Sequence, residues 1–209
     1  MGLTYFGVPD YLVLGLRNSL SLGTFIETGT NVGNTCRWAA RHFDHVVSIE
    51  ADERLYQTAR QNVGNRPNVD LRFGASQSVL RSVVPALAGP ALFWLDAHWC
   101  GPETAGLDHQ CPVLEEIDAI DAGGRQHVIL IDDARMFINS GLYPAPIRPE
   151  QWPSCQQVFD RLRAKSTNFY IAIQDDVIVR VPARWREALE RLQKSRPALL
   201  LQGKLTARL

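Results

Sequence analysis

Short apolar runs alternate with amphipathic stretches along most of this sequence, and that alternation constrains the fold more than any other feature. The apolar runs have the length of buried strands, and the stretches between them have the periodicity of helices. Strands separated by helices form βαβ units, which place the strands parallel in one sheet with right-handed crossovers. We expect strands at residues 24–28, 45–50, 69–73, 91–96 and 127–131, and helices at residues 32–42, 52–63, 76–87 and 111–120.

Two further apolar runs near the end of the chain have the spacing of a β-hairpin. They cover residues 169–173 and 177–181 and are separated by Gln174, Asp175 and Asp176. A short polar connection of this kind joins antiparallel strands. The sequence therefore predicts an α/β fold with a doubly wound, mostly parallel seven-stranded sheet that ends in a C-terminal antiparallel hairpin.

The chain of 209 residues is long enough for one domain with a sizeable core. We expect a single domain over residues 1–209, with its core at about residues 20–182 and with an N-terminal helix and a basic C-terminal helix as extensions. Residues 180–209 hold eight basic and two acidic residues. We interpret this segment as a solvated helix face rather than an anion-binding patch.

Charge and hydropathy argue against several classes of partner. The 22 basic and 22 acidic residues leave a net charge of zero, which argues against nucleic acid as the main partner. No apolar run has the roughly 18 residues that a membrane span needs. The N-terminal stretch lacks the features of a signal peptide, so we expect a cytoplasmic protein whose four cysteines are reduced.

The first predicted strand runs into a glycine turn that has the spacing of a cofactor site. Gly29 and Gly33 permit a tight turn and a close backbone approach at the start of a helix. Glu50 ends the next strand, where an acid can accept hydrogen bonds from both ribose hydroxyls of an adenosine. Asn31 stands where a dinucleotide fingerprint needs glycine, and Glu27 would repel a pyrophosphate but could hold an ammonium group.

With this turn, an acid that ends the second strand and an alternating sheet closed by a hairpin, the chain resembles the class I S-adenosylmethionine (SAM)-dependent methyltransferases over roughly residues 20–182. The resemblance implies a Rossmann-like fold and SAM as cofactor. It also implies that Glu27, Gly29 and Gly33 surround the methionine part of SAM, and that Glu50 binds the ribose. The other expected cofactor contacts are Thr28, Asn31, Ala51, Ala75, Ser76 and Asp96, with Ala75 and Ser76 near the adenine.

Three carboxylates follow the fourth and fifth predicted strands. Asp96 ends one strand and Asp132 and Asp133 end the other, so neighbouring parallel strands bring them to one edge of the sheet. Clustered carboxylates repel one another unless they are protonated or bridged by a cation, and oxygen ligands suit Mg²⁺, Mn²⁺ or Ca²⁺. The three positions resemble the metal-binding acids of the macrocin-type sugar O-methyltransferases, which implies Mg²⁺ or Mn²⁺ here. A capping role for Asp132 and a solvated Asp133 are the alternative.

The chemistry that this resemblance implies is methyl transfer from SAM to an oxygen of a small-molecule acceptor. The protein must align the methyl group with the nucleophile and remove the proton of the nucleophile. His98 is our candidate general base because its intrinsic pKa lies near neutrality. Asp96, Glu115 and Glu116 are alternatives as the catalytic base, and a purely structural role for His98 is another.

Two His-x-Cys pairs form a second group of side chains that competes with this interpretation. His98, Cys100, His109 and Cys111 could bind zinc, although Cys-x-x-Cys is the usual spacing of a structural zinc site. A disulfide between Cys100 and Cys111 is another alternative, and free buried thiols are the one that we favour.

The leading hypothesis is a SAM-dependent methyltransferase of small molecules, with a sugar, a phenol, a peptide side chain or an amine as acceptor. Phe137, Tyr143 and Trp152 could wall the acceptor pocket, or could equally anchor a long loop. One alternative is a metal-dependent hydroxylase or hydrolase that uses the acid cluster and His98. Another is a non-catalytic module that binds SAM or a nucleotide and docks a partner through its basic C-terminal segment. A homo-oligomer is compatible with each hypothesis.

Overall fold

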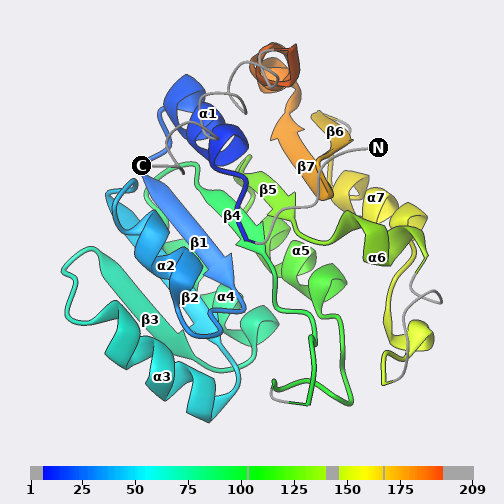
Figure 1. Ribbon diagram of the computed structural model, residues 1–209. Coiled ribbons are helices and arrows are strands. Elements are labelled where there is room, and N and C mark those ends of the chain that lie inside the picture. The colour runs from blue at the N-terminus through cyan, green and yellow to red at the C-terminus, as the bar shows by residue number, and fades with distance from the viewer. Residues whose placement is uncertain (1–6, 103, 140–145, 167, 195–209) are drawn as a thin grey trace, which may run out of the picture.

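The computed structural model describes residues 7–102, 104–139, 146–166 and 168–194. A seven-stranded sheet runs through this part of the chain, in the order β3-β2-β1-β4-β5-β7-β6 (Figure 1). The strands are β1 (Thr24–Thr28), β2 (His45–Glu50), β3 (Val69–Phe73), β4 (Leu92–Leu95), β5 (Val128–Ile131), β6 (Phe169–Gln174) and β7 (Val177–Pro182). The helices are α1 (Asp10–Leu20), α2 (Asn34–Ala39), α3 (Glu53–Val63), α4 (Ser76–Val83), α5 (Val113–Ala122), α6 (Ala134–Ile138) and α7 (Cys155–Arg163), and residues 186–194 are also helical.

The pairing of the strands confirms the predicted sheet. β1 pairs in parallel with β2 and β4, β2 with β3, and β4 with β5, whereas β7 lies antiparallel to both β5 and β6. Asp175 and Asp176 form the turn of the hairpin with φ angles of 50° and 66°. Positive φ angles at both turn residues match the twist of the strands that the turn connects.

Helix boundaries differ from the prediction at the glycine turn and near prolines. α2 begins at Asn34 rather than at residue 32, because Gly33 has a φ of +86° and still belongs to the turn. α5 begins at Val113, after Pro112 as its N-cap. The helix predicted over residues 76–87 is α4 followed by a 3₁₀ turn, Val84–Ala86, since the proline at position 85 has no N–H to continue the α-helix.

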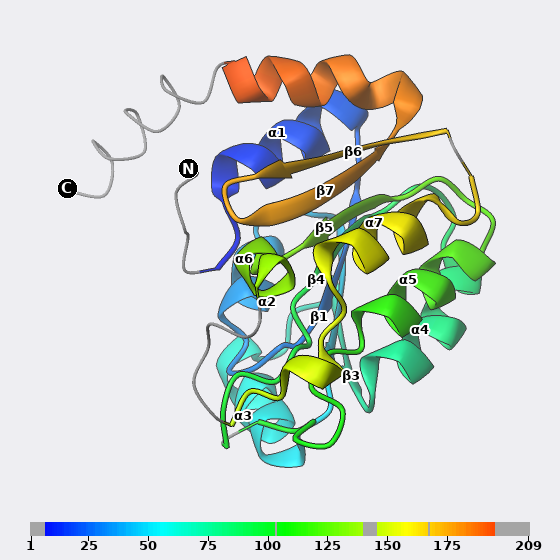
Figure 2. The ribbon, with the colours of Figure 1, turned by 90° about the vertical axis from the view of Figure 1, so that its right-hand side faces the viewer.

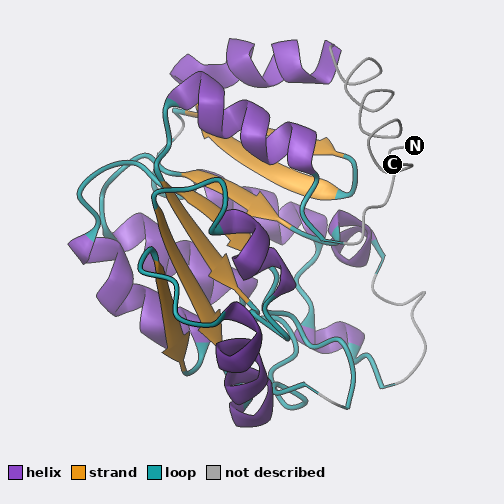
Figure 3. Ribbon diagram, turned by 60° about the vertical axis from the view of Figure 1, so that its left-hand side comes forward, coloured by secondary structure: helices purple, strands orange, loops and turns teal. Residues whose placement is uncertain are grey.

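Residues that alternate along each strand are buried on opposite faces of the sheet, so two cores form. Phe25 and Trp94 pack on the face that α1 and α2 cover, whereas Ile26 and Phe93 pack on the face of α4, α5 and α7. The two-residue period of a strand produces this division. Figures 2 and 3 show the sheet between the two layers of helices. Burial on both faces explains why the central strands are continuous apolar runs in the sequence.

The chain changes its direction of winding between β1 and β4, which are neighbours in the sheet. The connection after β1 leads to α2 on one face, and the connection after β4 leads to α5 on the other. In open α/β sheets, a crevice forms at the carboxyl ends of strands at such a switch point, and ligands bind there. The topology thus predicts a ligand-binding crevice at the carboxyl ends of β1 and β4.

The helix over residues 186–194 carries exposed ion pairs between side chains four residues apart. Arg186 pairs with Glu190 at 2.7 Å, and Arg191 lies 3.6 Å from Glu187. Pairs of this spacing are typical of a solvated helix face. The prediction is wrong for Arg180, which lies in β7 and is fully buried, and residues 195–209 of the basic segment lie outside the described residues. Among the described helices, none has the length and hydropathy that a membrane span requires.

A buried ion pair ties the hairpin to α5. Arg180 of β7 is fully buried and donates two hydrogen bonds to the carboxylate of Asp121, at 2.8 and 2.6 Å. Its guanidinium also lies 4.2 Å from the centre of the Phe169 ring. A buried charge without its partner is costly, so each member of the pair depends on the other.

We predict that Arg180→Met lowers the free energy of unfolding by about 3–5 kcal/mol, because it leaves the Asp121 carboxylate buried without a counter-charge. The double substitution of Asp121→Leu with Arg180→Met removes both charges and should recover most of that loss. Urea unfolding measures both values. A loss below about 1 kcal/mol in the single variant would show that the pair behaves like an exposed one.

Candidate functional site

The turn after β1 is shaped by a close approach between two backbones. Gly29 has a φ of +79°, and its N–H donates to the carbonyl of Ile49 in β2 at 2.9 Å. A Cβ atom at this position would lie 2.2 Å from the carbonyl oxygen of Asp96, just after β4. Only glycine fits such a position. The turn therefore brings the carboxyl ends of β1, β2 and β4 together.

Glu50 closes the turn from the end of β2. One carboxylate oxygen accepts the N–H of Asn31 at 2.7 Å, and the other accepts those of Ala51 and Asp52 at 2.9 and 2.8 Å. Burial raises the pKa of Glu50 above its ordinary value, while these hydrogen bonds act in the opposite direction. Asn31 has a φ of 51°, a left-handed conformation that asparagine tolerates better than most residues.

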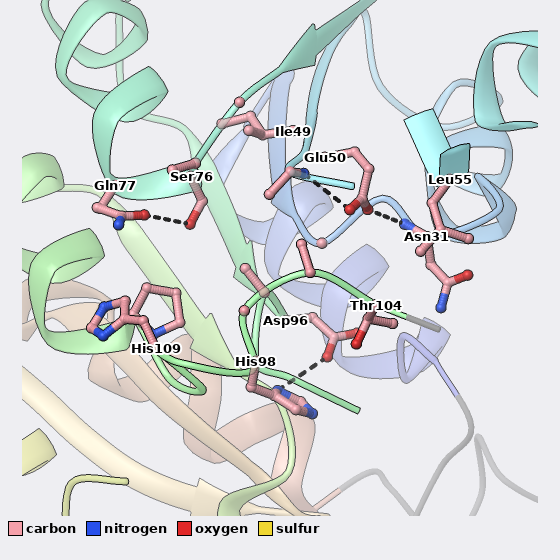
Figure 4. A pocket seen from close by; sticks show the side chains of 18 of the residues that line it. Asn31, Ile49, Glu50, Leu55, Ser76, Gln77, Asp96, His98, Thr104 and His109 are labelled. Carbon is pink, nitrogen blue, oxygen red and sulfur yellow. Dashed lines mark hydrogen bonds and ion pairs between the residues drawn. The ribbon is translucent and has the colours of Figure 1, made fainter. Parts of the chain in front are cut away.

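A cavity of about 290 Å³ opens at this edge of the sheet (Figure 4). It brings together predicted site residues from several elements: Gly29, Asn31, Glu50, Ala51, Ala75, Ser76, Asp96 and His98. In Figure 4, Glu50 and Ser76 lie on one side of the space, and Asp96 and His98 lie on the other. The predicted ribose and adenine contacts and the predicted catalytic residues are thus walls of one cavity.

Three residues predicted to contact the cofactor, Glu27, Thr28 and Gly33, are not among the described residues that line this cavity. Glu27 is 1% exposed and hydrogen-bonded to Ser48, and burial raises its pKa to about 8. A Cβ atom on Gly33 would lie 2.9 Å from Cγ2 of Val63, so the glycine lets the turn pack against α3. In this arrangement, Glu27 and Gly33 stabilise the turn through buried contacts and do not face the cavity.

His98 lies between two acids of the predicted cluster and contacts both. Its Nε2 lies 3.0 Å from Oδ2 of Asp133, and its Nδ1 lies 3.5 Å from Oδ1 of Asp96. On the other side, Nη1 of Arg135 lies 2.7 Å from Oδ1 of Asp133. The backbone N–H of Asp133 donates to Oδ1 of Asp132 at 2.7 Å. The structure brings the predicted residues together and adds the cationic Arg135, which the sequence analysis missed.

These contacts decide which groups of the cluster carry a proton. Burial lowers the pKa of His98, but the hydrogen bond with Asp133 and the nearby carboxylates outweigh burial and raise it to about 9. Burial and the charges of Asp96 and Asp133 raise the pKa of Asp132 to about 8, and burial raises that of Asp96 to about 6. Against the effect of burial, contacts with His98 and Arg135 lower the pKa of Asp133. These shifts favour a proton on His98 and on Asp132 at neutral pH, which would relieve the repulsion among the carboxylates.

Within the described ranges, no group of three or more His, Cys, Asp or Glu side chains has the geometry of a metal site. As their side chains lie, Asp96, Asp132 and Asp133 do not form a ready set of ligands for Mg²⁺ or Mn²⁺. Cys100 is exposed and Cys111 is buried, and both are free thiols. The prediction of buried free thiols is therefore confirmed for Cys111 and wrong for Cys100, which lines the open cavity.

The outer wall of the cavity comes from a loop to which we assigned no cofactor contact. Residues 99–102 and 104–110 contribute Cys100, Thr104, Ala105, Gly106 and His109 to the lining. The other lining residues that the sequence analysis missed are Ile49, Leu55, Gly74, Gln77, Ala97 and Pro112. The signal for the loop in the sequence is its length at the carboxyl end of a strand, where long loops usually shape the site.

Trp152 covers His98 from a second loop. The centres of the two rings lie 5.3 Å apart, and the Phe137 ring lies 5.7 Å from that of Trp152. Both aromatic residues are buried. Their burial supports the alternative in which they anchor their segments to the body of the protein, and neither is among the described residues that line the cavity. Tyr143, which we expected beside them, lies outside the described residues.

We predict that Gly29→Ala lowers the free energy of unfolding by about 2–5 kcal/mol, the sum of a left-handed backbone penalty and an overpacked contact with Asp96. Gly124→Ala is the matched control. Gly124 has a φ of +69°, but a Cβ atom added there would meet no atom within 4 Å, so that variant should lose only about 1–2 kcal/mol. Equal losses in urea unfolding would contradict the close approach at Gly29.

A further prediction concerns the charge of His98. Because its folded pKa is about 9, its imidazole should carry a proton at neutral pH and lose it as the pH rises through that value. NMR of the imidazole nitrogens measures this directly. Asp133→Asn should lower the pKa of His98, whereas Asp70→Asn, at an exposed acid on β3, should leave it unchanged. A neutral wild-type His98 at pH 7 would contradict the prediction.

No known protein-family model matches the sequence, and a search of curated proteins gives no match. Solved structures do match. The SAM complex of TomG from Streptomyces achromogenes, an O-methyltransferase involved in tomaymycin synthesis, has a TM-score of 0.57 and 15% identity, over 85% of this chain and 81% of its own. An O-methyltransferase from Bacillus cereus in complex with S-adenosylhomocysteine (SAH) has a TM-score of 0.58 and 17% identity, over 85% and 82%.

A third similar structure is SAM-bound CalS10, an amino pentose methyltransferase from Micromonospora echinaspora. It has a TM-score of 0.54 and 12% identity, over 83% of this chain and 89% of its own. Likeness at such low identity establishes the architecture. The predicted Rossmann-like α/β fold is therefore confirmed, and the chain has the fold of the SAM-dependent methyltransferases.

Proposed function

We propose that the protein is a SAM-dependent methyltransferase that acts on a small-molecule acceptor, with a hydroxyl oxygen as the methylated atom. The observation that carries the proposal is the position of Glu50, whose carboxylate ends β2 and lines a cavity next to the glycine turn. The same fold in TomG and in the Bacillus cereus enzyme, with SAM and SAH bound, supports it.

The residues of the cavity fit an adenosine that carries a cationic tail. A carboxylate has about four acceptor positions, and the backbone N–H groups on Glu50 occupy three of them, which leaves one for a ribose hydroxyl. Ile49 and Leu55 offer apolar faces for a purine, while Ser76 and Gln77 offer polar edges. The described lining residues include no Lys or Arg, which suits a sulfonium cation better than a cofactor that carries phosphates.

SAM, when bound, would supply an activated methyl group. The chain must orient the acceptor and take up its proton. His98, our predicted general base, carries a proton at neutral pH in the contacts that it makes here. We therefore assign proton uptake to Asp96, which lines the cavity and has a pKa of about 6. His98 would orient that carboxylate from 3.5 Å.

A divalent cation, Mg²⁺ or Mn²⁺, stays a prediction for the same cluster. Asp96, Asp132 and Asp133 would be its ligands, and it would lower the pKa of an acceptor hydroxyl. As the side chains lie, however, Asp133 is bound by His98 and Arg135, and the three acids do not have the geometry of a metal site.

The proposal includes a cytoplasmic location for the protein and a small molecule as its substrate. Free thiols at all four cysteines support a reducing, cytoplasmic setting. The net charge of zero supports a small molecule rather than a nucleic acid as substrate.

Thermal unfolding with SAH tests the proposal without a known acceptor. Ligand at about 100 times its Kd stabilises a protein by about 2.7 kcal/mol, which raises Tm by roughly 5–10 °C at this chain length. We expect Glu50→Ala to abolish the shift, because it removes the acceptor for a ribose hydroxyl and the group that holds the N–H of Asn31.

Glu53→Ala is the matched control, because Glu53 is an exposed carboxylate at the start of α3. That variant should keep the full shift. A wild-type protein that shows no shift with SAM or SAH, but does shift with NAD or with Mg²⁺ alone, would contradict the proposal. That outcome would favour the hydroxylase or hydrolase alternative.

A further inference from the structure

Two long loops meet at the site and are joined by one buried side chain. The first loop, described over residues 99–102 and 104–110, follows β4 and forms one wall of the cavity. The second loop, residues 146–154, precedes α7 and carries Trp152. Figure 2 shows both at the lower end of the molecule, the first in green and the second in yellow.

Gln110 closes the first loop. The N–H of Trp99 donates to the Gln110 carbonyl at 2.7 Å, so the loop leaves the body of the protein and returns to it at one point. Within the loop, the N–H of His109 donates to the carbonyl of Gly106 at 3.0 Å. These bonds fix His109, a residue of the cavity wall, directly beside Gln110.

The side chain of Gln110 is fully buried and bonded to the second loop. Its Oε1 accepts the N–H of Arg148 at 2.8 Å and Nε1–H of Trp152 at 3.3 Å, and its Nε2 donates to the carbonyl of Pro146 at 2.9 Å. Its backbone N–H donates to the side chain of Gln151 at 2.9 Å. A buried amide bonded in this way is costly to displace, since any shift leaves polar atoms unpaired.

Trp152 extends this connection to the acid cluster. Its indole N–H binds Gln110, and its ring packs 5.3 Å from the ring of His98. Gln110 therefore stands between His109, which faces the cavity, and Trp152, which covers His98. Because Gln110 belongs to the first loop and is hydrogen-bonded to the second, a displacement of one loop would move the other.

We propose that Gln110 is a positioning residue that holds the cavity wall and the cover of His98 as one unit. The proposal rests on the proposed function, because it takes the cavity to be the site of SAM and SAH. Gln110 acts through His109 on one side and through Trp152 on the other. A residue that only fastens two loops would affect stability alone, whereas a positioning residue also changes ligand affinity and the surroundings of His98.

The test measures the Kd of SAH by calorimetry and the imidazole NMR signal of His98. Gln110→Ala should weaken SAH binding about tenfold, as expected when a buried hydrogen-bond network is lost, and should shift the His98 signal. Trp152→Phe keeps a ring over His98 but removes the N–H bonded to Gln110, so we expect smaller changes in the same direction. Gln156→Ala is the control, because this exposed amide bonds Asp160 within α7, and it should change neither quantity.

The proposal is wrong if Gln110→Ala lowers only the free energy of unfolding and leaves both the Kd of SAH and the His98 signal at their wild-type values. If Gln110→Ala does not fold, Trp152→Phe decides the question by the same two measurements. If the wild-type protein does not bind SAH, the proposed function fails. In that case the His98 signal still decides, because a shift supports the positioning role and an unchanged signal overturns it.

Discussion

The structure depends on one close contact between backbones, the approach of Gly29 to the end of β4. Because residue 29 has no side chain, the carbonyl of Asp96 can lie where it would be 2.2 Å from a Cβ atom. The N–H of Asp96 donates to the carbonyl of Thr28 at 3.2 Å, which extends the pairing of β1 and β4 beyond the sheet. The turn then presents the N–H of Asn31 to Glu50. As a result of this local geometry, the carboxylates of Glu50 and Asp96 lie on two sides of one cavity.

The acid cluster is held in turn by a segment far along the chain. The N–H of Ala134 donates to the carbonyl of Asp176 at 2.7 Å, and the N–H of Arg135 donates to its carboxylate at 2.8 Å. Asp176 belongs to the turn of the antiparallel hairpin. The hairpin that completes the sheet therefore also fixes the start of α6, and through Arg135 it reaches Asp133 and His98. Completion of the fold and assembly of the site depend on the same contacts.

Much of the fold could be predicted because buried strands are continuous apolar runs and their order follows from βαβ connections. The cofactor half of the site could also be predicted, since Gly29 and Glu50 are each tied to the end of a strand. We predicted no helix over α7, although Ser154 and Gln157 form a capping box that is legible in the sequence. The contacts of Gln110 could not be predicted, because its side-chain partners lie 36 to 42 residues along the chain. The charge of His98 depends in the same way on an acid from another strand.

The most direct test of the central claim is a crystal structure of the protein with SAH bound. We expect a ribose hydroxyl to lie at hydrogen-bond distance, about 2.5–3.0 Å, from the carboxylate of Glu50. We also expect the adenine to lie between Leu55 and the side chains of Ser76 and Gln77, and the sulfur to be directed toward Asp96. SAH bound elsewhere, or a Glu50 carboxylate turned away from the ribose, would contradict the proposed cofactor site.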